Sequence, residues 1–208
     1  MQHRDQPTVH SWRIAAEAHG PRWIFPARPA DTVNQYADFL QEFFCEGPEP
    51  DGVLHISADT DFAVWLNGRL IGYGQYSNFP DRKTYECFPV GGLLREGNNT
   101  LAITVFYNGR TSSVYWRGDP GLLFEVRGSK SLAVSGTGTH CRSNPCYHSG
   151  PIAIVSGQLA YTFGYDARGE DGFNGKDYVP GDGWAPVAES EAILPDDRAV
   201  LSPRPVAR

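Results

Sequence analysis

Short runs that alternate between apolar and polar residues follow one another along much of the chain. Residues 53–57 read Val-Leu-His-Ile-Ser, and residues 62–66 read Phe-Ala-Val-Trp-Leu directly before Asn67-Gly68. Successive side chains of a strand point to opposite faces, so this pattern predicts strands with a buried face. Asn-Gly between two such runs predicts a hairpin, because both central residues of the turn need a positive φ.

Further runs of the same kind continue toward the carboxyl end, with turn residues between them. They cover residues 69–73, 101–107, 121–127, 131–134, 152–155 and 158–163. Strands at intervals of roughly ten residues are typical of a β-sandwich. We therefore predict an all-β chain with a leader at residues 1–22 and a β-sandwich at residues 23–163. Residues 164–208 are rich in Gly, Asp and Pro, which predicts a loop-rich extension that ends as a linker.

Residues 32–44 allow two interpretations. Apolar residues at positions 33, 36, 39, 40 and 43 follow the 3.6-residue period of a helix, and Asp31 is a suitable N-cap. The same segment could equally be a leading strand that carries an aromatic face. Periodicity alone leaves this choice open.

Composition and charge exclude several classes of protein. The 208 residues include 23 Gly and 16 Pro, a density that disfavours a helical bundle. Lys and Arg total 18 against 24 Asp and Glu, and a net charge of −6 argues against nucleic acid or an anionic membrane as a partner. No apolar run approaches the ~18 residues of a membrane span, and no signal peptide is visible. These features predict a cytoplasmic location.

The sequence carries no motif for a nucleophilic serine, a P-loop, a dinucleotide site or a zinc protease. Carboxylates do occur in pairs, at residues 59 and 61, 170 and 171, and 196 and 197. Hydrolysis of a glycosidic bond needs two carboxyl groups about 5–10 Å apart across the sugar, and the sequence does not show such an arrangement. We interpret Asp59 as a residue that ends a strand and begins the turn after it.

The four cysteines are too few to hold a chain of this length together by disulfides. Cys45 and Cys87 each adjoin phenylalanine, which predicts buried free thiols. Cys141 and Cys146 lie near two histidines, but their spacing is loose for a zinc loop and no second Cys/His pair supports one. We therefore expect no metal or other cofactor, and interpret this segment as a local disulfide or an ordinary loop.

Aromatic residues at strand ends and in loops suggest a surface for carbohydrate. A sugar stacks its CH groups on aromatic rings and exchanges hydrogen bonds through its hydroxyls. The candidate carbohydrate-binding residues are Tyr73, Gln75, Tyr76, Arg82, Tyr115 and Trp116. The competing interpretation is that such aromatics close the ends of a sandwich core. Trp65, inside an apolar run, is predicted to be a core residue.

The segment that begins ISADTDFAVWLNGRLIGYGQYSNFPDRKTYE and continues to LLREGNNTLAITVFYNGR resembles the N-terminal β-sandwich of bacterial α-L-rhamnosidases, family 78 of the glycoside hydrolases. The order of the motifs carries the resemblance, which covers about residues 23–205. Similar modules occur in family 2 glycoside hydrolases, and the motifs that favour the rhamnosidases are Asp166-Ala167-Arg168 and Gly183-Trp184.

The resemblance implies a jelly-roll, galactose-binding-like β-sandwich that lacks catalytic residues. The family's acid and base belong to an (α/α)6 barrel, so they have no matching positions here. It further implies an accessory domain that packs on this catalytic domain of the same polypeptide and contacts carbohydrate. The two alternatives are a free-standing carbohydrate-binding module and a structural interaction domain without a ligand.

Overall fold

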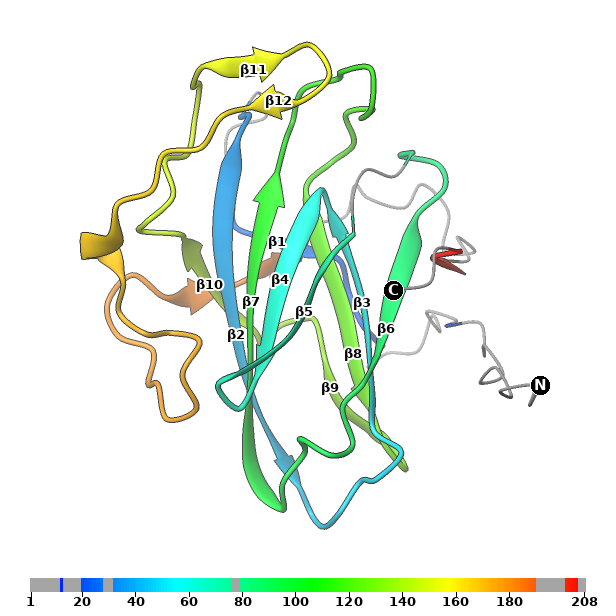
Figure 1. Ribbon diagram of the computed structural model, residues 1–208. Helices are drawn as coiled ribbons and strands as arrows, with labels where there is room; N and C mark the ends of the chain where they lie inside the picture. The colour runs from blue at the N-terminus through cyan, green and yellow to red at the C-terminus, as the bar shows by residue number, and fades with distance from the viewer. Residues whose placement is uncertain (1–11, 13–19, 28–31, 76–78, 190–200, 206–208) are drawn as a thin grey trace, which may run out of the picture.

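The chain folds into two large β-sheets that pack face to face (Figure 1). The computed structural model describes residues 12, 20–27, 32–75, 79–189 and 201–205. Within them, every named element is a strand except one turn of 3-10 helix, η1 (Ala167–Gly169). The predicted all-β sandwich is confirmed, whereas its jelly-roll subclass stays a prediction.

The first sheet has the strand order β14-β1-β8-β3-β6-β15, and β9 also pairs with β8. Its strands are β1 (Ile24–Phe25), β3 (Val53–Asp59), β6 (Thr84–Pro89), β8 (Gly121–Arg127), β9 (Ser131–Val134), β14 (Ala188–Glu189) and β15 (Ser202–Pro203). All of these pairings are antiparallel except that of β15 with β6.

The second sheet has the strand order β13-β10-β2-β7-β4-β5. Its strands are β2 (Gln35–Cys45), β4 (Asp61–Leu66), β5 (Arg69–Gly74), β7 (Gly97–Tyr107), β10 (His140–Ser143) and β13 (Ala185–Pro186). A separate hairpin of β11 (Ile154–Ser156) and β12 (Ala160–Tyr161) lies at one end of the sandwich in Figure 1.

The core lies between the two sheets. It is built from alternate residues of each strand, such as Leu54 and Ile56 of β3, Val64 of β4, Ile103 of β7 and Phe124 of β8, all of them buried. A second buried cluster covers the outer face of the first sheet, where Trp12, Trp23 and Leu201 surround Tyr85 and Leu123. Apolar side chains therefore cover the inner face of the first sheet and part of its outer face.

The ambiguous segment is a strand. Residues Gln35–Cys45 pair with β7 along their whole length, from Gln35 opposite Tyr107 to Cys45 opposite Gly97. Phe39 and Phe43 enter the core, whereas Asp38 and Leu40, on the opposite face, are also buried. Burial on both faces explains why the apolar positions imitate a helix. The proposed N-cap, Asp31, lies outside the described residues.

The Asn67-Gly68 turn is confirmed. It joins β4 to β5, with φ of +53° at Asn67 and +82° at Gly68. The Asn67 side-chain amide donates hydrogen bonds to the Leu93 carbonyl and to Asn99 Oδ1, at 2.9 and 2.8 Å. The hairpin is thereby fastened to the segment that leads into β7.

Two residues predicted to be in the core lie elsewhere. Trp65 is half-buried on the outer face of β4, because Phe62, Val64 and Leu66 occupy the inward positions of that strand. Cys87 is exposed, since its neighbour Phe88 pairs with the core residue Leu54 and the two-residue period turns Cys87 outward. Cys45, by contrast, is a buried free thiol as predicted.

The segment after β12 covers part of the outer face of the second sheet. Figure 1 shows it, in yellow and orange, beside β10 and β2. It then supplies β13 to the second sheet and β14 to the first. The predicted extension thus pairs with both sheets. No helix in the described ranges has the length and apolarity needed to span a bilayer.

Candidate functional site

The structure does not gather the six candidate carbohydrate-binding residues on one surface. Tyr73 and Trp116 have exposed fractions of 64% and 61%, and Arg82 is also exposed. Gln75 and Tyr115 are buried. Tyr76 lies outside the described residues.

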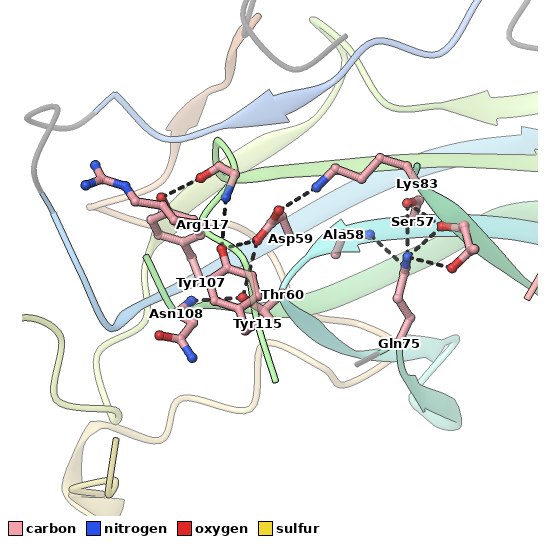
Figure 2. Close-up of polar contacts among 12 residues, drawn as sticks. Ser57, Ala58, Asp59, Thr60, Gln75, Lys83, Tyr107, Asn108, Tyr115 and Arg117 are labelled. Atoms are coloured by element: carbon pink, nitrogen blue, oxygen red, sulfur yellow. Dashed lines mark hydrogen bonds and ion pairs between the residues drawn. The ribbon is translucent and has the colours of Figure 1, made fainter. Parts of the chain in front are cut away.

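Asp59 is the centre of a buried polar network at the end of β3 (Figure 2). Its Oδ2 accepts a hydrogen bond from the ammonium group of Lys83, and its Oδ1 accepts one from the Tyr115 hydroxyl at 2.6 Å. Asp59 and Lys83 have exposed side-chain fractions of only 2% each, so this ion pair is shielded from water. As interpreted from the sequence, Asp59 ends a strand, and Thr60 alone separates it from β4.

This network fixes the loop that carries Trp116. Tyr115 is held by Asp59, and the Tyr107 hydroxyl donates to the Gly118 carbonyl at 2.8 Å. A Cβ at Gly118 would come within 2.7 Å of Asp59 Oδ2, so the loop approaches the carboxylate closely. Burial and the neighbouring Asp59 carboxylate raise the pKa of Tyr115, so its hydroxyl stays a donor. The exposed Trp116 is therefore presented by a fixed loop.

Gln75 has a similar structural role. Its side-chain oxygen accepts a hydrogen bond from the Ala58 amide at 2.9 Å, and its nitrogen donates to the Thr84 carbonyl at 2.5 Å. The side chain therefore connects β3, β6 and the residues that follow β5.

A pocket of about 280 Å³ lies between the second sheet and the extension. The sheet contributes Asp38, Trp65, Thr104 and Arg142, from β2, β4, β7 and β10. The remaining wall comes from residues 144–147, Tyr165 and residues 170–174. Sequence analysis did not identify this pocket, because its two walls are far apart along the chain.

Arg142 fastens the extension to the sheet beside this pocket. Its Nε donates to Asp38 at 3.1 Å, and its Nη2 donates to Asp171 at 2.9 Å. The guanidinium group also lies 4.5 Å from the ring centre of Trp184, the tryptophan of the Gly183-Trp184 motif. A planar guanidinium suits both a bidentate carboxylate and a stacked ring.

The two carboxylates that contact Arg142 have opposite pKa shifts. Hydrogen bonds from Arg142 are the largest cause that lowers the pKa of Asp171, to about 2. Burial is the largest cause that raises the pKa of Asp38, although Asn144, Thr104 and Arg142 all oppose it. The partly exposed Asp171 is therefore ionised at neutral pH and supplies the negative charge that pairs with Arg142.

The described carboxylate pairs are not arranged as an acid and a base across an open cleft. Asp59 forms an ion pair with Lys83, and Asp171 forms one with Arg142. The pair at residues 196 and 197 lies outside the described residues. Cys141 and Cys146 are free, so the predicted local disulfide is not formed; Cys141 lies in β10, and Cys146 lies in the loop that follows it. In the described part of the chain, no three His, Cys, Asp or Glu side chains are grouped as metal ligands.

The structure also explains the Asp166-Ala167-Arg168 motif. Asp166 is the N-cap of η1, and its carboxylate accepts hydrogen bonds from the Arg168 amide at 3.0 Å and from Arg168 Nε at 2.8 Å. The motif therefore forms a local turn. It positions the residues that follow, 170–174, over the pocket.

Several solved α-L-rhamnosidases match this fold over most of the chain. A family 78 rhamnosidase of Bacillus sp. GL1 matches with a TM-score of 0.79 and 23% identity, over 94% of this chain and 20% of its own. The chain has the fold of a rhamnosidase domain. An α-L-rhamnosidase from Aspergillus terreus matches with a TM-score of 0.67 and 23% identity, over 88% of this chain and 22% of its own. The resemblance expected from the sequence is confirmed at the level of fold.

Other comparisons cover a shorter stretch of this chain or have a lower TM-score. A β-galactosidase of Streptococcus thermophilus is 28% identical over 103 residues, which are 48% of this chain and 9% of the enzyme. A lectin of Pleurotus ostreatus has a TM-score of 0.55 and 15% identity, over 88% of this chain and 45% of its own. No family model matches the sequence. The chain spans about a fifth of the rhamnosidases and less than a tenth of the β-galactosidase.

Proposed function

We propose that this chain is a non-catalytic accessory domain of an α-L-rhamnosidase-like glycoside hydrolase. The observation that carries the proposal is the match between 94% of this chain and one fifth of a rhamnosidase from Bacillus sp. GL1. In such an arrangement the domain packs on the catalytic (α/α)6 barrel of the same polypeptide.

Exposed apolar side chains support the packing role. Val155, Leu159 and Phe163, in and beside the β11–β12 hairpin, have exposed fractions of 55%, 70% and 71%. A cluster of exposed apolar residues on a folded domain is typical of a contact surface. We propose this hairpin surface as the part that meets the catalytic domain.

Carbohydrate contact is the second part of the proposal. Trp116 and Arg82 offer an exposed ring and a charged donor, and the Phe79 ring centre lies 6.5 Å from that of Trp116. The fold likeness to a lectin solved in complex with GalNAc favours the alternative of a free-standing carbohydrate-binding module. That alternative predicts sugar binding without a catalytic partner.

A domain exchange tests the packing role. This chain would replace the matching domain of the Bacillus sp. GL1 rhamnosidase, and hydrolysis of an aryl rhamnoside and thermal unfolding would be measured. We expect an active enzyme with one unfolding transition, because the two domains would share a packed interface. Independent unfolding of the exchanged domain would contradict the packing role.

The hairpin surface is tested in the same exchanged enzyme. Replacing Leu159 and Phe163 by serine should separate the unfolding transitions, since it removes the apolar contact. The control is Val179→Ser, which changes a side chain that is 78% exposed but lies outside the hairpin. Equal effects of the two changes would exclude the hairpin as the contact surface.

A further inference from the structure

The pocket beneath the extension retains hydrogen-bonding groups that the fold does not use. Glu170 Oε1 accepts a hydrogen bond from the Tyr165 hydroxyl at 2.6 Å. Within the described ranges, Glu170 Oε2 and the side-chain amide of Asn174 have no hydrogen-bond partner. Together they offer a ligand one charged acceptor and one amide.

Aromatic side chains form the apolar part of the pocket. Trp65 is half-buried, and its ring meets that of Phe173 edge to face, with 6.2 Å between the ring centres. Tyr165 meets Tyr147 in the same way, at 4.8 Å. Aromatic rings beside hydrogen-bonding groups match the two surfaces of a sugar, its CH groups and its hydroxyls.

Charge and size restrict the ligand further. The lining contains three carboxylates, those of Asp38, Glu170 and Asp171, and the single cation Arg142. An anionic ligand is therefore disfavoured. Drug-sized ligands occupy pockets of about 300–1,000 Å³, so a pocket of about 280 Å³ suits one ring rather than an oligosaccharide.

We propose that this pocket binds one neutral monosaccharide unit, with Trp65 as the stacking surface and Glu170 and Asn174 as the groups that hydrogen-bond its hydroxyls. The inference rests on the proposed function and gives its carbohydrate contact a location other than the Trp116 surface. Packing of the extension uses the contact of Trp65 with Phe173 and the Oε1 atom of Glu170, but it does not use Glu170 Oε2 or the side-chain amide of Asn174. The Arg142 contact is complete with Asp38, Asp171 and Trp184.

Titration calorimetry of the 208-residue chain tests the pocket. The probes are methyl α-L-rhamnopyranoside and methyl β-D-galactopyranoside as neutral sugars, and D-galacturonate as an anion. We expect saturable binding of a neutral sugar in the millimolar range and weaker binding of galacturonate. Glu170→Ala and Asn174→Ala should each weaken binding by about tenfold, whereas Glu96→Ala, an exposed acid outside the pocket, should not. Unchanged melting temperatures would show that these variants fold.

Trp65→Ala and Trp116→Ala then separate the two surfaces. Loss of binding with Trp65→Ala alone supports the pocket. Loss with Trp116→Ala alone overturns the pocket, while the carbohydrate contact of the proposed function stands. Absence of binding up to about 50 mM of either neutral sugar overturns the pocket as well. The domain exchange described above tests the packing role independently of sugar binding.

Discussion

Asp59 lies in the interior together with the cation that neutralises it. Removing water from a single charge is costly, and breaking a buried pair by deleting one partner destabilises a protein by about 3–5 kcal/mol. Tyr115 adds a hydrogen bond to the same carboxylate at 2.6 Å. These three side chains are therefore coupled in stability, although they come from distant parts of the sequence.

Replacing Asp59 by asparagine should lower the free energy of unfolding by about 3–5 kcal/mol, because Lys83 would stay buried without its counter-charge. Tyr115→Phe should lower it by about 1.5–3 kcal/mol, the contribution of a hydrogen bond to a charged group. Urea denaturation measures both. Asp51→Asn, at an exposed position, is the control and should stay within about 0.5 kcal/mol of the parent. An Asp59→Asn protein as stable as the parent would contradict this account.

Single residues were the hardest feature to predict from the sequence. Gln75 and Tyr115 have the side-chain chemistry of sugar-binding residues, but the structure uses it for buried hydrogen bonds. Trp65 lies in an apolar run, but its position in the two-residue alternation turns it outward. Composition identifies what a side chain can bind, whereas the facing strand or loop determines what it does bind.

The strands themselves follow closely from local pattern. Residues 121–127 were predicted as a strand and form β8, and Asn67-Gly68 was predicted as a turn. Residues 35–45 showed the apolar period of a helix as well as the features of a strand, because both faces of β2 are covered. The pocket could not be predicted, since it requires residues 170–174 to reach strands of the second sheet.

The turn at Gly68 gives a prediction for the β4–β5 hairpin. Gly68→Val should destabilise the protein by about 1–3 kcal/mol, because a β-branched residue is strained at a φ of +82°. Gly68→Asn should cost less, since asparagine enters the left-handed region more readily, and both would meet the Lys176 backbone nitrogen at about the same distance. Thermal unfolding distinguishes the two variants, and equal melting temperatures would exclude backbone strain as the cause.

The contact between Arg142 and Asp171 gives a prediction for the extension. The pKa of Asp171 is lowered from its ordinary 3.8 to about 2, so the ionised carboxylate favours the folded state. This stabilisation is complete above about pH 4 and is lost as the pH falls toward 2. At pH 7, Asp171→Asn should lower the melting temperature by about 2–4 °C.

The pH dependence is the decisive measurement for this contact. The difference in melting temperature between parent and Asp171→Asn should shrink below pH 4 and vanish near pH 2. Asp182→Asn, an exposed position outside the pocket, serves as the control and should match the parent at every pH. A difference that persists unchanged to pH 2 would show that the carboxylate's charge is not its contribution.

The two sheets enclose one hydrophobic core, and the carboxylates of Asp59 and Asp171 are held in ion pairs. We expect the purified chain to release no nitrophenol from 4-nitrophenyl α-L-rhamnopyranoside beyond the rate without protein. The resemblance assigns the acid and base to an α-helical barrel, and the described part of this chain contains no α-helix. Turnover that persists at constant specific activity through repeated purification would overturn the accessory role.

The extension has one more consequence, because it supplies three of the four outermost strands of the two large sheets: β13, β14 and β15. An uncovered strand offers its row of amide and carbonyl groups to any other chain. A protein shortened after Gly183 would lose the core residues Val187 and Leu201 but keep the rest of the main core, and it would leave β1, β6 and β10 open along one side. Such a molecule should self-associate into thioflavin-binding fibrils. These short carboxyl-terminal strands therefore prevent edge-to-edge association between copies of the molecule.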